Sequence, residues 1–385
     1  MAFGLYIHWP YCESKCPYCD FNSHVANRID QARWISAYRS EIARVSAESP
    51  DSTLGTIFFG GGTPSLMSPD VVAAVIDAAR SAWRCANALE ITLEANPSSV
   101  EAGRLGAYRD AGVNRVSLGI QALNDADLRL LGRKHDRAEA LRAIETAQFV
   151  FDRVNLDLMY GRQYQSVPDW TRELAEALQF GTTHLSLYQL TIEEGTVFGR
   201  RHAAGQLQGL PDEDRSVAFF EATQALCDAA GLSAYEISNH ARPGQECRHN
   251  LIYWQAGTYA GIGPGAHGRL GIGPTRRATE AIRDPAGWLT AVETRGNGDV
   301  TVTPLSPLEQ AQEVLLMGLR LSEGVSLQRL EAAGIDWRNW MSCGQLLETG
   351  LLERDASHLR TSRDGRLLLN AILRQLCSDL RVDQT

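Results

Sequence analysis

Three cysteines near the start of the chain have a spacing that suits metal chemistry: Cys12, Cys16 and Cys19 form a CxxxCxxC motif. Cysteine thiolates are the usual ligands of iron–sulfur clusters, and three of them can hold three irons of a cubane [4Fe–4S] cluster. The fourth iron then stays open for a ligand that is not a protein side chain. The candidate is S-adenosylmethionine, bound through its amino and carboxylate groups.

Other uses of clustered cysteines fit this sequence less well. His8 and His24 could complete a zinc shell, but no second CxxC or HxxxH pair is present to close a tetrahedron. Eight cysteines in 385 residues are too few for a disulfide scaffold, and no signal segment precedes Tyr6. We therefore expect a reducing, cytoplasmic location. The remaining cysteines away from the loop are expected to be buried apolar residues in helices: Cys85, Cys227, Cys343 and Cys377.

Composition and charge limit the class of protein. The chain is 44% hydrophobic and 22% charged, as in an ordinary globular protein of two or three domains. No apolar run is long enough to cross a bilayer, so we expect no transmembrane segment. A net charge of −9 argues against binding nucleic acid through the overall field of the protein. We expect small molecules or proteins as partners.

From Gly4 to about Leu190, short apolar runs rich in β-formers alternate with longer amphipathic stretches, a pattern typical of βα units. We predict helices near residues 30–47, from about residue 69 and near 100–111. Six nearly continuous apolar runs predict parallel strands covered by helices: GLYIHW, TIFFGGGTP, LEITLEANP, RVSLGIQ, VNLDLMYG and HLSLYQL. The fold class is therefore α/β, a partial (β/α)6 TIM-like barrel over residues 1–195, with its chemistry at the carboxyl ends of the strands.

Beyond residue 195, short apolar runs no longer alternate regularly with amphipathic stretches. Residues 196–300 include a Gly- and His-rich stretch that we predict to form loops and short strands covering the barrel mouth. Residues 301–385 predict three helices and a hairpin, a helical, winged-helix-like module. Arg360, Arg363 and Arg366 could lie along a wing that binds nucleic acid, but the acidic total and the intervening Asp364 argue against it.

Polar residues at the ends of the predicted strands are candidates for a ligand pocket. The glycines of GGGT, Gly60 to Thr63, let the backbone approach a ligand closely, although a plain βα turn would also use them. Four more polar residues lie at or just beyond apolar strands, where unpaired groups are costly: Glu94, Gln121, Arg133 and Asp157. Either they satisfy one another or they face a polar ligand.

Together, CESKCPYCDF, GGGTPS, LEANP, LGIQ and LDLMYG resemble the radical S-adenosylmethionine branch that includes oxygen-independent coproporphyrinogen III dehydrogenase and the haem chaperones. The resemblance implies that Cys12, Cys16 and Cys19 ligate one [4Fe–4S] cluster. It places Tyr6, Gly61, Gly62 and Glu94 near the bound S-adenosylmethionine. Five further positions match contacts to a second copy of it in the dehydrogenase: Tyr18, Thr63, Gln121, Arg133 and Asp157.

Two departures from the dehydrogenase pattern favour a haem chaperone over that enzyme. The dehydrogenase has a further cysteine where this chain has Phe21, and it has an extension ahead of the first strand. In addition, HNLIYW matches the HNxxYW motif of the haem chaperones, with His249, Asn250, Tyr253 and Trp254 as its defining residues. An imidazole can ligate haem iron and aromatic rings can flank a porphyrin, although such a cluster is also common in protein cores.

The resemblance thus implies haem as cargo and haem-accepting proteins as partners, with membrane-bound respiratory enzymes among the candidates. Cys247, close to His249, is a second candidate iron ligand. The alternative function is a radical enzyme of the dehydrogenase type.

Overall fold

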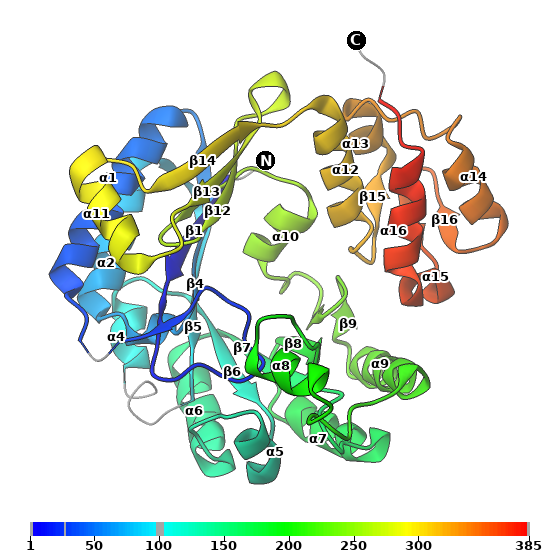
Figure 1. Cartoon of the computed structure of the whole chain (residues 1–385), viewed down its shortest axis with the longest axis horizontal. Coiled ribbons are helices and arrows are strands. Elements are labelled where there is room, and N and C mark those ends of the chain that lie inside the picture. Colours follow the sequence, from blue (N-terminus) through cyan, green and yellow to red (C-terminus); the bar gives the residue numbers. More distant parts are fainter. Residues whose placement is uncertain (1–2, 27, 98–103, 383–385) are drawn as a thin grey trace.

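The computed structural model describes residues 3–26, 28–97 and 104–382. Its centre is a 12-stranded sheet in the order β14-β13-β12-β11-β1-β4-β5-β6-β7-β8-β10-β9. The sheet curves into an open barrel with helices on its outer side, and a small C-terminal domain lies beside it (Figure 1). The order has two ends, so the barrel is partial.

The six predicted strands are confirmed, and neighbouring strands pair in parallel. They are β1 (Phe3–Trp9), β4 (Thr53–Gly61), β5 (Arg84–Ala95), β6 (Arg115–Gln121), β7 (Arg153–Tyr160) and β8 (His184–Gln189). The helices between them are α1 (Gln31–Glu48), α2 (Pro69–Ala82), α4 (Leu105–Asp110), α5 (Asp125–Leu130), α6 (Arg137–Val150) and α7 (Val167–Gln179). The first part of the helix predicted near 100–111 lies outside the described residues.

Helix ends follow local sequence signals. Asp30 caps α1 by accepting a hydrogen bond from the Arg33 N–H, and Ser68 caps α2, which has Pro69 in its first turn. The sheet and helices enclose an aromatic core in which Trp34 stacks on Trp288, with ring centroids 5.5 Å apart. This core holds α1 on the outer side of the barrel (Figure 1).

Short strands are present in residues 196–300, as predicted, and they extend the central sheet at both of its edges. Strand β11 (Tyr259–Ile262) pairs in parallel with β1, and β12 (His267–Leu270), β13 (Arg277–Ala281) and β14 (Asp299–Pro304) extend that edge in antiparallel order. At the other edge lie β10 (Asn239–Ala241) and β9 (Ser233–Ala234). Helices complete the region: α8 (Val197–Ala203), α9 (Glu213–Ala229), α10 (Arg248–Trp254) and α11 (Pro285–Arg295).

The C-terminal domain has its own apolar core and a three-stranded sheet in the order β15-β17-β16. Its helices are α12 (Pro307–Gly318), α13 (Leu327–Ala332), α14 (Met341–Glu348), α15 (Arg363–Leu367) and α16 (Leu369–Ser378). Its strands are β15 (Val325–Ser326), β16 (Leu352–Arg354) and β17 (His358–Thr361). The predicted helices and hairpin are thus present, and α10 lies between this domain and the barrel (Figure 1).

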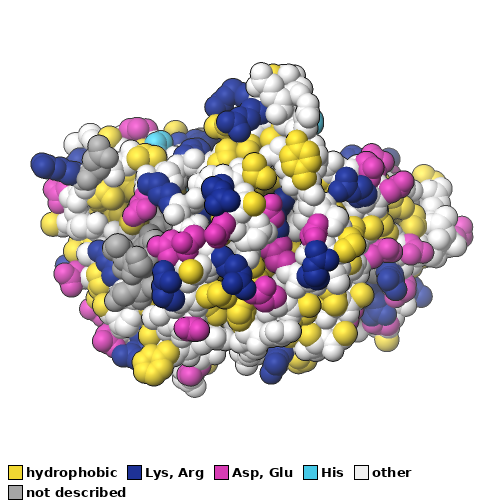
Figure 2. All heavy atoms as spheres, turned by 90° about the horizontal axis from the view of Figure 1, so that it is seen from below, with side chains coloured by type: hydrophobic (Ala, Val, Ile, Leu, Met, Phe, Trp, Pro, Cys, Tyr) yellow, Lys and Arg dark blue, Asp and Glu magenta, His cyan; other side chains and the backbone are white. Residues whose placement is uncertain are grey.

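Two of the three arginines of the predicted wing are engaged within the chain. Arg360 pairs with Glu353 and Asp355 on the same hairpin. Arg366 donates a hydrogen bond to the Arg320 carbonyl, and burial lowers its pKa. On the face shown in Figure 2, basic and acidic side chains are interspersed instead of separated by sign. Within the described residues, no helix is both long and apolar enough to span a membrane.

Candidate functional site

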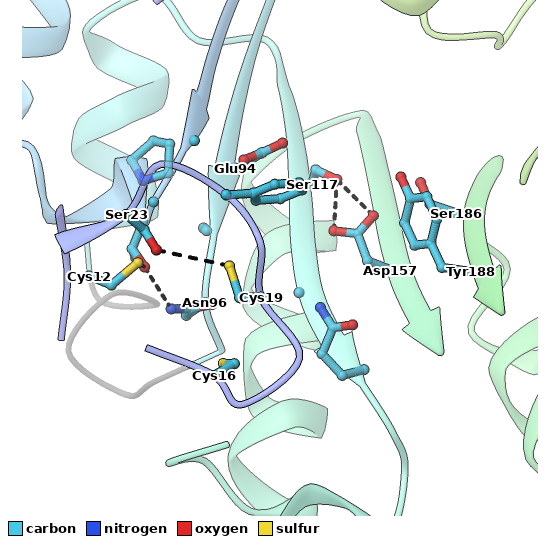
Figure 3. A pocket seen from close by; sticks show the side chains of 18 of the residues that line it. Cys12, Cys16, Cys19, Ser23, Glu94, Asn96, Ser117, Asp157, Ser186 and Tyr188 are labelled. Carbon is cyan, nitrogen blue, oxygen red and sulfur yellow. Dashed lines mark hydrogen bonds between the residues drawn. The ribbon is translucent and has the colours of Figure 1, made fainter. Parts of the chain in front are cut away.

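A cavity of about 750 Å³ lies inside the barrel at the carboxyl ends of its strands, and the cysteine loop forms one wall. Cys12, Cys16 and Cys19 all line it (Figure 3). The loop starts from the short strand β2 (Tyr11–Cys12), which pairs with β3 (His24–Val25). The structure therefore brings the three predicted metal ligands to the edge of one cavity.

Each thiol of the loop contacts a different polar partner. The Cys12 sulfur accepts a hydrogen bond from the Thr63 hydroxyl at 3.4 Å, and the Cys16 sulfur accepts one from Arg133 at 3.5 Å. The Cys19 sulfur lies 3.9 Å from the Ser23 hydroxyl. Burial raises the pKa of the Cys12 and Cys19 thiols.

The donor set fits a cluster with three sulfur ligands by residue type, and all three cysteines border the same cavity. Among the described residues, no three His, Cys, Asp or Glu side chains are gathered closely enough to hold a metal ion. The cysteines among the cavity-lining residues are the three of the loop. The histidines of the zinc alternative are engaged elsewhere: His8 contacts Tyr6 and the Asn22 carbonyl, and His24 contacts the Asn22 amide oxygen.

Other cysteines only partly match the prediction of buried positions in helices. Cys227 and Cys343 are buried in α9 and α14. Cys377 lies in α16 and is half-buried. The prediction for Cys85 is wrong, because this residue is exposed and lies in β5, before the strand enters the core.

The glycine turn after β4 approaches the cysteine loop through its backbone. The Gly62 N–H donates to the Trp9 carbonyl at 2.7 Å, and the Thr63 N–H donates to the Tyr11 carbonyl at 2.8 Å. A Cβ atom on Gly62 would lie 2.6 Å from the Tyr11 carbonyl oxygen, so a side chain does not fit there. Gly61 has a φ of 111°, which favours glycine. The N–H groups of Gly62 and Thr63 are thus paired within the chain, and the Gly61 N–H donates to Glu94.

Two carboxyl groups, Glu94 of β5 and Asp157 of β7, reach the cavity from the barrel interior (Figure 3). Burial and the charge of Asp157 raise the pKa of Glu94 to about 8, against the hydrogen bond that it accepts from the Gly61 N–H. Burial raises the pKa of Asp157 to about 6, although Ser117 and Asn155 donate hydrogen bonds to it. Burial thus destabilises the ionised form of both groups, and the positive charge of a bound ligand would stabilise it.

The inner wall of the barrel is a polar ladder that sequence reasoning missed. Asn155 donates hydrogen bonds to Ser117 at 2.7 Å and Ser186 at 2.8 Å, and Ser186 donates to Asn239 at 2.7 Å. Arg115 is buried and lines the same cavity. The signal was present as polar residues at every second position of apolar strands, because alternate side chains of a strand point to the same face: Arg115 and Ser117, Asn155 and Asp157, His184 and Ser186.

Arg133 and Gln121 line the cavity together with Tyr18, which lies within the cysteine loop. Besides Cys16, the Arg133 guanidinium donates to Asn96 at 2.6 Å and to the Gly119 carbonyl at 2.9 Å. Gln121 ends β6 with a φ of 67°, a sparsely populated conformation for a residue with a side chain, as is found at ligand sites. Asn96 was not predicted.

The HNLIYW segment forms α10. His249, Asn250 and Tyr253 line the 750 Å³ cavity, and Tyr253 and Trp254 line a neighbouring cavity of about 560 Å³. His249 is 1% exposed, and both ring nitrogens are engaged: Nδ1 with the Thr56 hydroxyl at 2.7 Å and Nε2 with the Tyr253 hydroxyl at 2.7 Å. Burial lowers the pKa of His249 to about 3, so the ring is neutral. In this geometry neither nitrogen is available to an iron.

Cys247, the other suggested iron ligand, is fully buried at the N-cap of α10. Its sulfur contacts Glu90 at 3.7 Å, and burial raises its pKa to about 11. Glu90 also accepts the His249 N–H at 3.1 Å and pairs with Arg153 at 2.6 Å. The start of α10 is therefore anchored to the barrel by a buried carboxylate.

Comparisons with known proteins agree with this geometry. The model of the Radical SAM superfamily matches residues 6–174, and that of the HemN C-terminal domain matches residues 305–368. In structure, the chain resembles coproporphyrinogen III oxidase (HemN) from Escherichia coli with a TM-score of 0.80 and 19% identity, covering 98% of this chain and 90% of that one. The barrel with its three-cysteine loop is thus that of a radical SAM protein.

Full-length relatives narrow the class. The chain is 40% identical to the bovine "Radical S-adenosyl methionine domain-containing protein 1, mitochondrial", over 98% of this chain and 88% of that protein. It is 37% identical to "Heme chaperone HemW" of Escherichia coli, over 96% of this chain and 97% of that protein. The Mycobacterium tuberculosis protein of the same name is 36% identical, over 97% and 94% of the two chains. The chain belongs to this HemW-type family of radical SAM proteins.

Proposed function

We propose that the protein is a haem chaperone that carries a [4Fe–4S] cluster and S-adenosylmethionine, binds haem and transfers it to acceptor proteins. The observation that carries the proposal is the position of α10. This helix places the HNLIYW segment at the wall of the cavity that the cysteine loop borders. The full-length relatives named as haem chaperones support the same conclusion.

In this proposal Cys12, Cys16 and Cys19 hold the cluster. When bound, the cluster supplies an open iron site and a source of single electrons. Thr63 and Arg133 stabilise negative charge on the sulfurs through the hydrogen bonds described above. Phe21, 60% exposed at the cavity, stands where the dehydrogenase has a further cysteine.

S-adenosylmethionine would occupy the space between the loop and the barrel wall. Glu94 and Asp157 are placed to accept hydrogen bonds from its amino group or ribose hydroxyls, and Tyr6, Gly61 and Gly62 line the same space. Tyr18, Thr63 and Gln121 would enclose the ligand from the side of the loop.

We further propose haem-accepting proteins as partners, with membrane-bound respiratory enzymes among the candidates, and a reducing, cytoplasmic location. The described cysteines are all free, which supports a reducing compartment.

The test is haem uptake and release by anaerobically purified, cluster-reconstituted protein. We expect a Soret band on addition of haemin, and we expect the bound haem to be transferred to a haem-free globin. A variant with Cys12, Cys16 and Cys19 replaced by Ala should lose iron and sulfide. Reconstituted protein without a Soret band would contradict the proposal. Release of 5′-deoxyadenosine together with decarboxylated porphyrinogen would support the enzyme instead.

A further inference from the structure

A second cavity, of about 560 Å³, adjoins the first, and Tyr6, Phe21 and Glu94 line both. Its other walls come from α10, the β11–β13 edge of the sheet and α12, so it lies between the barrel and the C-terminal domain. A volume of this size is in the range of cofactor sites, roughly 300 to 1,000 Å³. The cluster and S-adenosylmethionine need the first cavity, which leaves the second without a role.

Aromatic side chains give this second cavity flat apolar walls. Tyr253, Trp254 and Tyr259 line it together with Phe21. Tyr253 and Tyr259 meet edge to face with ring centroids 4.5 Å apart. The indole N–H of Trp254 is buried and has no hydrogen-bond partner among the described residues. Such walls suit a large planar ligand that carries a few polar groups.

The charged side chains around the second cavity indicate the sign of the ligand's charge. Arg269, Arg276 and Arg283 line it, and Glu313 of α12 pairs with the first two at 2.5 and 3.3 Å. No ion pair to Arg283 is found within the described part of the chain. The other lining carboxyl group is Glu94, whose pKa burial raises to about 8. Three guanidinium groups against one carboxylate therefore leave two positive charges near neutral pH, which match a ligand with two carboxylates.

The same cavity is lined by an imidazole that has no hydrogen bond within the described part of the chain. His267, at the start of β12, is exposed and lines it, and its ring makes no hydrogen bond to the rest of the described chain. His8, which also lines the cavity, uses both ring nitrogens in hydrogen bonds. Neutral imidazole is a common axial ligand of haem iron.

We propose that this second cavity is the haem site, with His267 as an iron ligand and Arg276 and Arg283 binding the propionates. The macrocycle lies against Trp254 and Tyr253. In this arrangement His249 does not bind iron. It is a positioning residue that holds the Tyr253 ring through a hydrogen bond with the Tyr253 hydroxyl. The assignment rests on the proposed haem-chaperone function.

Haemin titration of the full-length, cluster-reconstituted protein tests the assignment. His267→Ala should shift the Soret maximum and weaken haem binding at least tenfold, and Arg283→Ala should weaken it about tenfold by removing a charge-assisted hydrogen bond. The matched controls are His202→Ala and Arg129→Ala, which remove the same groups from exposed positions outside both cavities. These controls should bind haem as the wild type does.

Competition with S-adenosylmethionine gives a second, independent readout. Haem should still bind when S-adenosylmethionine saturates the first cavity, so that one protein molecule holds both ligands at once. Mutual exclusion of the two ligands would place haem in the first cavity and overturn the assignment. The assignment would also be overturned if both His267→Ala and Arg283→Ala gave the titration curves and spectra of the wild type. A wild-type protein that takes up no haem would instead refute the proposed function.

Discussion

The raised pKa of Glu94 predicts how S-adenosylmethionine binding depends on pH. With a pKa of about 8, only about a tenth of the molecules have this carboxyl group ionised at pH 7. If the cationic ligand binds only the ionised form, its apparent association constant equals the intrinsic constant multiplied by that fraction. Raising the pH from 6 to 8 increases the ionised fraction, and hence the association constant, by as much as about fiftyfold. Glu94→Gln keeps a hydrogen-bond acceptor for the Gly61 N–H but cannot ionise.

The assay is anaerobic equilibrium dialysis of S-adenosylmethionine against reconstituted wild type and Glu94→Gln between pH 6 and pH 8. Titration of the ligand itself affects both proteins equally, so the ratio of the two association constants isolates Glu94. The ratio should rise with pH. Glu145→Gln, which changes an exposed residue of α6, should follow the wild type. Parallel curves for wild type and Glu94→Gln would refute the reasoning.

Three further substitutions test the framework of the site by urea unfolding. Gly62→Ala forces a Cβ atom against the Tyr11 carbonyl oxygen, so we expect a loss of about 1 to 3 kcal/mol and a lower iron content; Gly344→Ala, with open space around its Cβ, should be neutral or up to about 1 kcal/mol more stable. Thr56→Val leaves the buried Nδ1 of His249 without its partner and should cost about 1 to 3 kcal/mol; unchanged stability would contradict the structural role of His249. Glu90→Gln removes the charge facing Arg153 and should cost about 3 kcal/mol, whereas Asp110→Asn in an exposed pair should cost less than about 1 kcal/mol; equal effects would contradict the burial of the Glu90 pair.

The barrel strands could be predicted because each contains a mostly apolar run between turns. The edge strands could not: β9 and β10 have two and three residues, too few to show a period. The parallel pairing of β11 with β1 joins residues some 250 positions apart, for example Leu5 and Ala260. Tertiary contacts, which no local pattern carries, decide where such strands lie.

The candidate site was predictable where chemistry restricts the residue type. The cysteine loop, the glycine turn, Glu94 and Asp157 fall at one cavity as expected. The orientation of a side chain was not predictable. The HNLIYW segment marks a helix, but its histidine turns inward to Thr56, and the residues of the second cavity come from separate strands and from α12.

In the proposed function, the sulfurs of Cys12, Cys16 and Cys19 hold a cubane cluster whose fourth iron binds S-adenosylmethionine. Electron paramagnetic resonance of the reduced, anaerobically prepared protein tests it most directly. We predict a [4Fe–4S] signal that changes when S-adenosylmethionine is added and that is lost when any one of Cys12, Cys16 and Cys19 is replaced by Ala. A signal that does not respond to S-adenosylmethionine, or a preparation that binds zinc in place of iron, would contradict the account.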